Sequence, residues 1–230
     1  MEKKFDFYAS GPGDHLVESS FFPKEIVLFL EKEKEIVQEA LRASGLLFEV
    51  GCMEGRYLDV ALSEGKKYFG IDLVERYVKK GNEVLSKKGL PTSDFVIQQA
   101  DASSIDEVFS KNNLDRALVI FPFNSFGNMV NKDDVIASLA RTRKPFLIFT
   151  YNTDALSNDA RLQYYKNCGY KNIRYEENDE GVRFFSDEGL NTIAYKEDYI
   201  KNEFKKMGID IEGVRFSNIG IVYQGFFNPQ

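Results

Sequence analysis

Three short segments carry residues whose types and spacing could bind a nucleoside-like ligand. In the first, Glu49-Val50-Gly51-Cys52-Met53-Glu54-Gly55-Arg56, an apolar run ends in a turn with two glycines. Glycine lets the backbone approach a ligand closely, and a helix that begins there would present unpaired N–H groups to an anion. Asp72 follows 17 residues after Gly55 and could accept two hydrogen bonds from a ribose diol. Asp101, 29 residues further on, could accept a hydrogen bond from the exocyclic amine of an adenine.

These segments need elements that bring them to one edge of a sheet. Apolar runs alternate with stretches of helical periodicity, which is typical of βαβ units and predicts a parallel sheet with helices on both faces. The predicted strands are residues 46–50, 67–72, 94–99, 116–121 and 145–150. The predicted helices are residues 24–43, 56–62, 74–85, 105–109, 135–139, 155–168 and 197–207. The three candidate segments follow the first three strands and would therefore meet at their carboxyl ends, where open α/β sheets bind ligands.

The pattern changes after the fifth strand. Two β-like runs occur at residues 182–185 and 191–195, and two alternating runs at 209–216 and 219–223 predict an antiparallel hairpin. The apolar parity slips at Glu212-Gly213, which predicts a β-bulge. The expected fold is a Rossmann-like, seven-stranded, mostly parallel sheet with helices on both faces and a C-terminal antiparallel hairpin.

The predicted elements divide the chain into four parts. An N-terminal lid segment (1–23) precedes a cofactor-binding core (24–169). An insertion (170–195) would cap a substrate site over the strand ends, and a C-terminal helix and hairpin (196–230) would complete the core.

Each candidate segment also has a purely structural interpretation. Gly51 and Gly55 suit an ordinary strand–helix turn, and either aspartate suits a solvated loop. Their joint placement at consecutive strand ends favours ligand binding. A dinucleotide-binding dehydrogenase is disfavoured, because its Gly-x-Gly-x-x-Gly pattern would need glycines where Met53 and Arg56 stand.

Together these residues resemble the class I S-adenosylmethionine-dependent methyltransferases, over about residues 24–227. Glu49-x-Gly51-x-x-x-Gly55 resembles the family's glycine motif, Asp72 its ribose acid and Asp101-Ala102 its adenine-side pair. Residues 121–128 resemble the loop that faces donor and acceptor in the family. The resemblance implies S-adenosyl-L-methionine as the cofactor. It also implies these cofactor-binding residues: Glu49, Gly51, Cys52, Met53, Gly55, Asp72, Leu73, Asp101, Ala102 and Phe121. Met53 is a departure, since the family usually has its middle glycine there.

Methyl transfer from a sulfonium needs an acceptor held in line more than it needs a strong base. Three residues are candidates for the acceptor side. His15, the only histidine, could act as a general base in the lid segment, or could be a surface histidine. Asn124 could orient an acceptor, or could serve the turn beside Pro122. Tyr151, just past the fifth strand, is the third. Cys52 suits the turn as a small residue better than it suits a nucleophile, because no histidine is near it in sequence.

The charge and the composition of the chain argue against several kinds of partner. The net charge of −6 argues against nucleic acid as the main partner, and the base-amino methylation motif Asn/Asp-Pro-Pro-Tyr/Phe is absent. No apolar run is long enough for a membrane span, the N-terminus carries no secretory signal, and two cysteines make no disulfide framework, so we expect a cytoplasmic protein. No metal is expected, and the sequence carries no signal for the oligomeric state.

These observations predict a methyltransferase acting on an O or N atom of a small molecule by in-line displacement. Two alternatives stay open. A peptide or protein methyltransferase would need an open groove rather than a cap. A catalytically inactive, methyltransferase-like binding module is suggested by Met53, whose side chain could crowd the methionine end of the cofactor.

Overall fold

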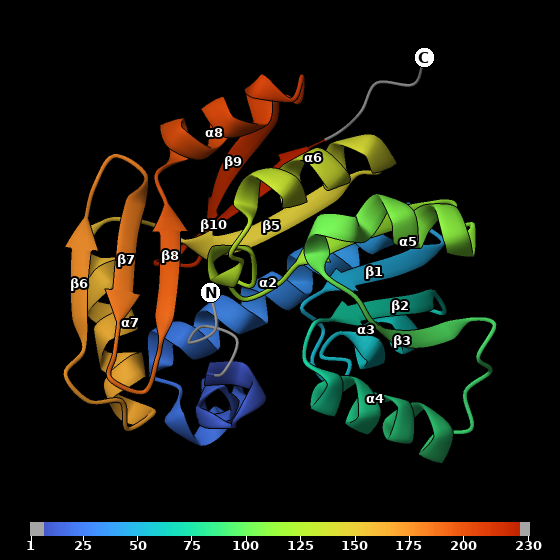
Figure 1. The fold of residues 1–230 in the computed structure, drawn as a ribbon, viewed down its shortest axis with the longest axis horizontal. Helices are drawn as coiled ribbons and strands as arrows, with labels where there is room; N and C mark the ends of the chain where they lie inside the picture. Colours follow the sequence, from blue (N-terminus) through green and yellow to red (C-terminus); the bar gives the residue numbers. More distant parts are fainter. Residues whose placement is uncertain (1–6, 226–230) are drawn as a thin grey trace.

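The computed structural model describes residues 7–225 and contains one large and one small β-sheet (Figure 1). The strands of the large sheet are β1 (Leu46–Val50), β2 (Lys67–Asp72), β3 (Phe95–Gln99), β4 (Ala117–Phe121), β5 (Phe146–Tyr151), β9 (Ile211–Phe216) and β10 (Gly220–Gly225). Their order is β3-β2-β1-β4-β5-β10-β9. The first five are parallel, and β10 is antiparallel to both β5 and β9. The predicted Rossmann-like fold is confirmed.

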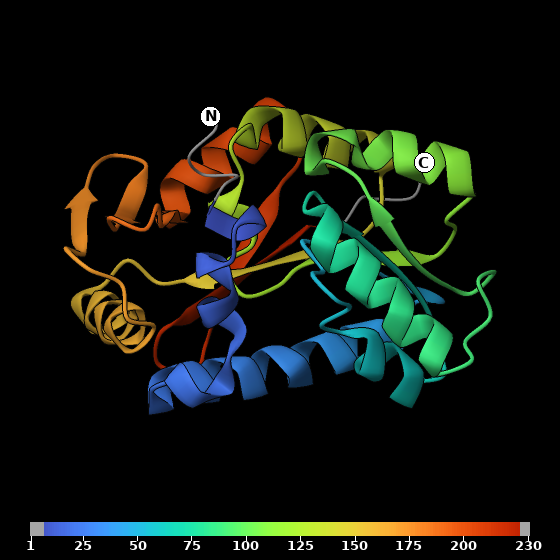
Figure 2. The ribbon, with the colours of Figure 1, turned by 60° about the horizontal axis from the view of Figure 1, so that its bottom comes forward.

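Helices cover both faces of this sheet. They are α2 (Lys24–Leu41), α3 (Leu58–Ser63), α4 (Glu75–Lys87), α5 (Ile105–Asn112), α6 (Lys132–Thr142), α7 (Ala155–Asn167) and α8 (Glu197–Lys206). In Figure 2, α2 and α3 lie on one side of the sheet and α5, α6 and α8 on the other. Leu47 packs with the first group and Phe48 with the second, which is why the central strand β1 is apolar at successive positions.

The small sheet has the order β6-β7-β8, with β6 (Arg174–Glu177), β7 (Gly181–Phe185) and β8 (Asn191–Tyr195) all antiparallel. The sequence prediction located β7 and β8 but missed β6. All four residues of β6 are exposed, so this edge strand carries no apolar alternation that would reveal it. The small sheet stands beside α7 at one end of the large sheet (Figure 1).

The C-terminal hairpin contains no bulge, so that prediction was wrong. Residues of β9 and β10 pair without interruption from Ile211↔Gly225 to Phe216↔Gly220. The apolar parity slips because different helices cover the two faces of β9. Gly213 faces Glu197 of α8, whereas Phe216 packs 4.8 Å, centroid to centroid, from Phe29 of α2.

The N-terminal segment contains two 3-10 turns, η1 (Pro12–Val17) and η2 (Ser19–Phe21). An ion-pair cluster attaches it to α4. The Arg76 guanidinium donates to both carboxylate oxygens of Asp14, at 2.9 and 2.6 Å, and to the carbonyl of Tyr8 at 2.5 Å. The Tyr77 hydroxyl donates to Asp14 at 2.5 Å. We call Asp14, Arg76 and Tyr77 the clasp, because they hold the segment beside the end of β2.

Candidate functional site

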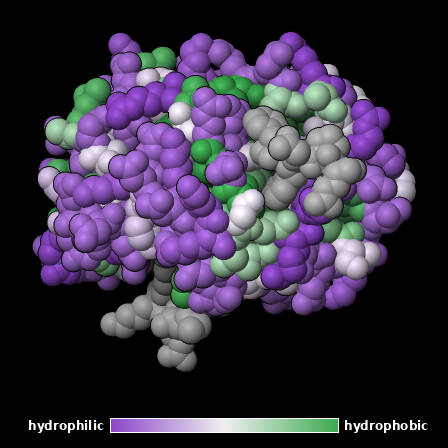
Figure 3. All heavy atoms as spheres, turned by 90° about the horizontal axis from the view of Figure 1, so that it is seen from above, coloured by the Kyte–Doolittle hydropathy of each residue, from purple (hydrophilic) through white to green (hydrophobic). Residues whose placement is uncertain are grey.

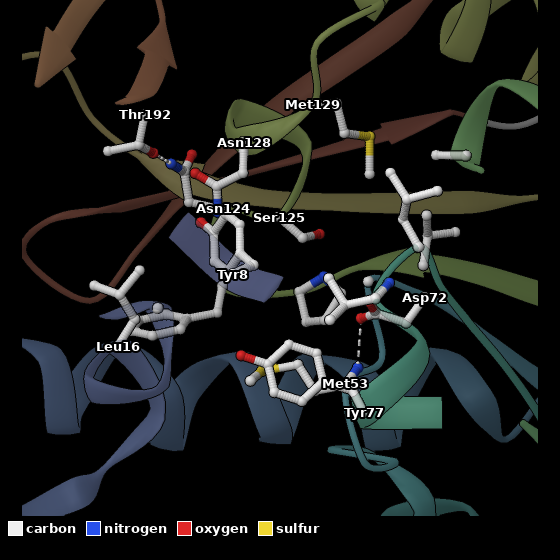
Figure 4. A pocket seen from close by; sticks show the side chains of 18 of the residues that line it. Tyr8, Leu16, Met53, Asp72, Tyr77, Asn124, Ser125, Asn128, Met129 and Thr192 are labelled. Atoms are coloured by element: carbon white, nitrogen blue, oxygen red, sulfur yellow. Dashed lines mark hydrogen bonds between the residues drawn. The ribbon is translucent and has the colours of Figure 1, made fainter. Parts of the chain in front are cut away.

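A cavity lies at the carboxyl ends of β1, β2, β4 and β5, under the N-terminal segment (Figure 4). Asp72 and Tyr151, the last residues of β2 and β5, contribute to its wall together with Gly51, Asp101 and Asn124 in the loops after β1, β3 and β4. Tyr8 and Leu16 of the N-terminal segment close it from one side, and Thr192 of β8 closes it from another. Sequence segments far apart along the chain therefore meet at one site.

The carboxylate of Asp72 is the acidic group at the centre of this edge. One oxygen accepts the Met53 N–H at 2.8 Å, and the other accepts the Val74 N–H at 2.9 Å. Burial raises the pKa of Asp72, and these two hydrogen bonds oppose that rise by favouring the ionised form. Each oxygen keeps a lone pair for a ligand hydroxyl. The side chain is 7% exposed and lines the cavity, which suits the expected ribose role.

The glycine turn has the geometry that needs glycine but lacks the N–H groups that the sequence led us to expect. Gly51 has φ +74°, and a Cβ there would lie 3.2 Å from Ser125. Its N–H and that of Cys52 both bond to the carbonyl of Ile71. The N–H groups of Met53, Gly55, Arg56 and Tyr57 also have protein acceptors. The prediction of unpaired N–H groups for an anion was therefore wrong at these six positions.

Glu49 supports the turn and does not line the cavity. Its side chain is fully buried, and one oxygen accepts the Tyr57 N–H at 3.0 Å and the Tyr68 hydroxyl at 2.6 Å. Burial raises the pKa of Glu49 to about 8. The predicted direct contact with the cofactor is replaced by a supporting contact with the loop that would carry it.

Three further predicted cofactor residues also lie outside the cavity wall. The thiol of Cys52 points into the core beside Gly70, and burial raises its pKa well above the usual range. Gly55, with φ +96°, faces Ile97. Phe121 packs in the core, 5.5 Å from Phe126 between ring centroids. Met53, Leu73, Asp101 and Ala102 do line the cavity.

His15 lies away from the cavity, so the structure does not bring this candidate base to the site. Its Nδ1 lies 2.8 Å from the carbonyl of Cys168, and its ring packs against Phe21 and Tyr170. The reason is that the 3-10 turn points successive side chains in different directions, and Leu16 rather than His15 faces inward.

Asn124 and Tyr151 are both brought to the cavity. Asn124 adopts φ +58°, and its amide donates to Thr192 Oγ1 at 2.9 Å while accepting from Thr150 at 2.5 Å (Figure 4). The ring of Tyr151 packs between Phe29 and Phe123. Its hydroxyl has no hydrogen bond to any residue between 7 and 225, and burial raises its pKa well above the usual range. It would therefore be protonated and free to donate at neutral pH.

Several residues of the cavity wall were not predicted from the sequence. Ser125 Oγ and Asn128 Oδ1 are buried there without a hydrogen-bond partner in the described part of the chain. The Arg56 guanidinium lies 4.5 Å from the Phe123 ring centroid and makes no ion pair or hydrogen bond within residues 7–225. Ser125, Asn128 and Arg56 stand inside the two segments that the sequence singled out, so their positions, though not their roles, were available.

Glu33 was also not predicted as a residue of the site. The sequence does mark it, because a charged residue there interrupts the apolar stripe of α2. It is fully buried and accepts the Tyr57 hydroxyl at 2.5 Å and the Phe123 N–H at 2.8 Å. It thus ties α2 to the loops after β1 and β4. Its pKa is raised by burial, and the nearby Arg56 charge acts in the opposite direction.

The apolar part of the cavity reaches the surface. Val17, Leu73 and Val130 line it and are all among the exposed large apolar side chains of the described chain. Figure 3 shows a strip of hydrophobic atoms across an otherwise hydrophilic face. Among residues 7–225, no helix is long and apolar enough to cross a membrane.

The sheet is mostly parallel, its antiparallel C-terminal strand β10 lies between β5 and the edge strand β9, and Asp72 stands beside a glycine turn. This is a Rossmann-like arrangement suited to binding a nucleoside. Residues 48–148 match the family model described as a methyltransferase domain. This part of the chain is therefore similar to a methyltransferase domain, which supports methyltransferase activity with S-adenosyl-L-methionine as the cofactor.

Solved structures agree on the fold. A protein from Pyrococcus horikoshii superposes with a TM-score of 0.67 at 15% identity, covering 94% of this chain and 98% of that one. The magnesium protoporphyrin IX methyltransferase of Synechocystis gives 0.63 at 13% identity, covering 97% of each chain. A 1,6-didemethyltoxoflavin-N1-methyltransferase from Burkholderia thailandensis gives 0.59 at 12% identity, covering 97% and 85%. No curated protein sequence matches the chain.

Proposed function

We propose that this methyltransferase acts on an O or N atom of a small-molecule acceptor by in-line displacement. The observation that carries the proposal is the enclosure of the cavity's acceptor side. Leu16 of the N-terminal segment, Tyr164 and Tyr165 of α7, and Thr192 of β8 surround it. A peptide substrate would need an open groove at the place where these elements meet.

The residues of the wall fit the cofactor. Asp72 would accept from the ribose hydroxyls, and Asp101 with Ala102 would lie beside the adenine. Arg56 is the cationic side chain of the wall, so it would hold the carboxylate of the methionine tail, for which the glycine turn has few free N–H groups. Ser125 and Asn128 offer unpartnered oxygens to the same ligand. When bound, S-adenosylmethionine supplies an electrophilic methyl group on a sulfonium.

The chain's own contribution is orientation and exclusion of water. The Asn124 amide is fixed by Thr150 and Thr192, and the rings of Phe123 and Tyr151 wall the acceptor side. When binding already holds an acceptor atom in line with the methyl group, the reaction loses less entropy in reaching the transition state, and its barrier is lower. We place Asn124 and Tyr151 at the acceptor and leave His15 without a role.

The experiment has two stages. Calorimetry with S-adenosylmethionine tests cofactor binding, and mass spectrometry of a metabolite panel incubated with protein and cofactor detects methylated products. Binding followed by methylation of small acceptors supports the proposal. Binding without turnover, with Met53 crowding the tail, supports the inactive binding module, and methylation of peptides alone overturns the small-molecule proposal.

A further inference from the structure

Arg161 is a fully buried cation with no carboxylate partner among the described residues. Its guanidinium donates to the carbonyl of Val182 at 3.2 Å and, more weakly, to the carbonyl of Thr192 and the hydroxyl of Tyr165, both at 3.5 Å. It also lies over the rings of Phe184 and Tyr151, 4.4 and 5.1 Å from their centroids. Carbonyls and rings solvate the charge but do not cancel it, and an uncompensated buried charge is costly.

The position of Arg161 relates this charge to the acceptor. Tyr151, Tyr165 and Thr192 are its neighbours, and all three line the cavity. The guanidinium therefore stands directly behind the acceptor wall, where the low local dielectric strengthens its field.

Two tyrosine hydroxyls are available to a ligand there. Tyr165 receives a hydrogen bond from Arg161 and donates none to the described residues, and Tyr151 has no hydrogen-bond partner in that part of the chain. Tyr164 differs, because its hydroxyl donates to the carbonyl of Leu16. Tyr151 and Tyr165 can thus donate protons to an anion, and Arg161 polarises the second of them.

Among residues 7–225, no group on the acceptor side can remove a proton. His15 lies outside the cavity, Glu33 is buried behind the N–H of Phe123, and Asp72 is bonded to two backbone N–H groups on the cofactor side. The charges of Glu33 and Arg56 compensate each other in part, whereas no carboxylate of the described residues forms an ion pair with Arg161. The acceptor must therefore either arrive ionised or react as a neutral amine, and the field of Arg161 disfavours a cationic amine.

We propose that the acceptor reacts as an oxyanion, the conjugate base of a carboxylic acid or of an acidic phenol or enol, held by the hydroxyls of Tyr151 and Tyr165 with Arg161 behind them. This inference rests on the proposed function and names its acceptor class. The acceptor oxygen forms a bond to the methyl carbon as the carbon–sulfur bond breaks, and the bonding pair goes to sulfur. The negative charge of the oxyanion and the positive charge of the sulfonium cancel, so no proton has to leave.

The test uses 4-nitrophenol, whose neutral and ionised forms differ in absorbance, added to protein saturated with S-adenosylhomocysteine. We expect the bound probe to be about tenfold more ionised than the free probe at the same pH, because an opposite charge favours the ionised form. In Arg161→Met the bound probe should become less ionised than the free probe, since only the desolvating aromatic wall remains. Arg42→Met, at an exposed arginine on the far end of α2, is the matched control and should behave as wild type.

A second variant tests the inference independently if Arg161→Met does not fold. Tyr165→Phe keeps the ring and should weaken binding of ionised nitrophenol about tenfold, the usual effect of losing a hydrogen bond to a charged group. Benzoate should also bind better than benzyl alcohol, and benzyl alcohol better than benzylamine. A bound nitrophenol that is more neutral than the free probe, a preference for benzylamine, or no binding of either anion overturns the inference. Binding of S-adenosylhomocysteine in the same samples shows whether the cofactor site itself is intact, so failure of the two proposals can be told apart.

Discussion

Glu49 and Asp72 are buried acidic residues near the carboxyl ends of neighbouring strands, but they have different structural roles. Asp72 lines the cavity and keeps free lone pairs, whereas Glu49 lies below the glycine turn and holds the N–H of Tyr57. Both residues were predicted to bind the cofactor from the same family resemblance, but Asp72 is the last residue of its strand whereas Glu49 still lies within β1. A motif therefore identifies a position in the fold but not which way the side chain points.

Asp72→Ala should weaken binding of S-adenosylhomocysteine by about 1 to 3 kcal/mol, because the ribose hydroxyls lose a charged acceptor. Isothermal calorimetry measures the change. Asp59→Ala is the control, since Asp59 is an exposed aspartate that pairs only with Lys88. Equal affinities for wild type and Asp72→Ala would remove Asp72 from the ribose site.

Glu49 should make the free energy of unfolding depend on pH between about 5 and 8. Its pKa rises from 4.5 to about 8 on folding, so between these values the folded state holds a proton that the unfolded state has released. The free energy of unfolding should therefore fall as pH rises from about 5 to 8, by up to a few kcal/mol from this group. Glu49→Gln keeps an acceptor for Tyr57 and Tyr68 but does not titrate. Urea unfolding at about pH 5 and pH 8 measures the free energy of unfolding, which should fall less between these pH values in the variant than in wild type. An equal fall in both proteins would contradict the pKa assigned to Glu49.

At the scale of elements, the N-terminal segment is attached to the core by side chains rather than by a regular element. The clasp holds it to α4, and the hydroxyl of Tyr164 holds Leu16 to α7. These contacts place Tyr8 and Leu16 over the cavity. The position of the segment over the cavity therefore depends on these polar contacts together with the packing of Phe7 and Leu16 in the core.

Asp14→Asn should loosen the segment, because it removes the charge that pairs with Arg76. Both side chains are partly exposed, so we expect about 1 kcal/mol or less, seen as up to fivefold weaker binding of S-adenosylhomocysteine. Hydrogen exchange should increase in residues 7–17 and stay unchanged in β1. The pKa of Asp14 is lowered, chiefly by its bonds to Arg76 and Tyr77 against the effect of burial, so the clasp persists at neutral pH and is lost only on strong acidification. Unchanged exchange in Asp14→Asn would mean that packing alone holds the segment.

At the scale of the whole molecule, the cavity joins the large sheet, the N-terminal segment, α7 and the small sheet. A ligand bound there contacts all of them and should stabilise the protein as a unit. At a concentration 100 times its Kd, S-adenosylhomocysteine should add about 2.7 kcal/mol to the free energy of unfolding. For a chain of this size that corresponds to a rise in Tm of about 5 to 10 °C by calorimetry. Asp72→Ala at the same ligand concentration should show a smaller rise, and no rise in wild type would contradict cofactor binding.

The sequence by itself determined the alternation of strands and helices and the sheet with its terminal hairpin, and its resemblance to a known family implied the cofactor. These depend on local signals: the periodicity of apolar residues, the glycines after β1, and Asp72 at the end of β2. Such signals can be read because each concerns residues within one strand–turn–helix unit.

Only the tertiary structure decided which further residues lie beside Asn124 and Tyr151, the two residues of this region that the sequence predicts. Tyr8, Arg161 and Thr192 come from three separate elements, and no period or spacing relates them. Packing of α7 and the small sheet against the end of the large sheet brings them together, and the inward turn at Leu16 leaves His15 outside. Long-range packing sets which side chains face a cavity, and that information does not reside in any short stretch of the chain.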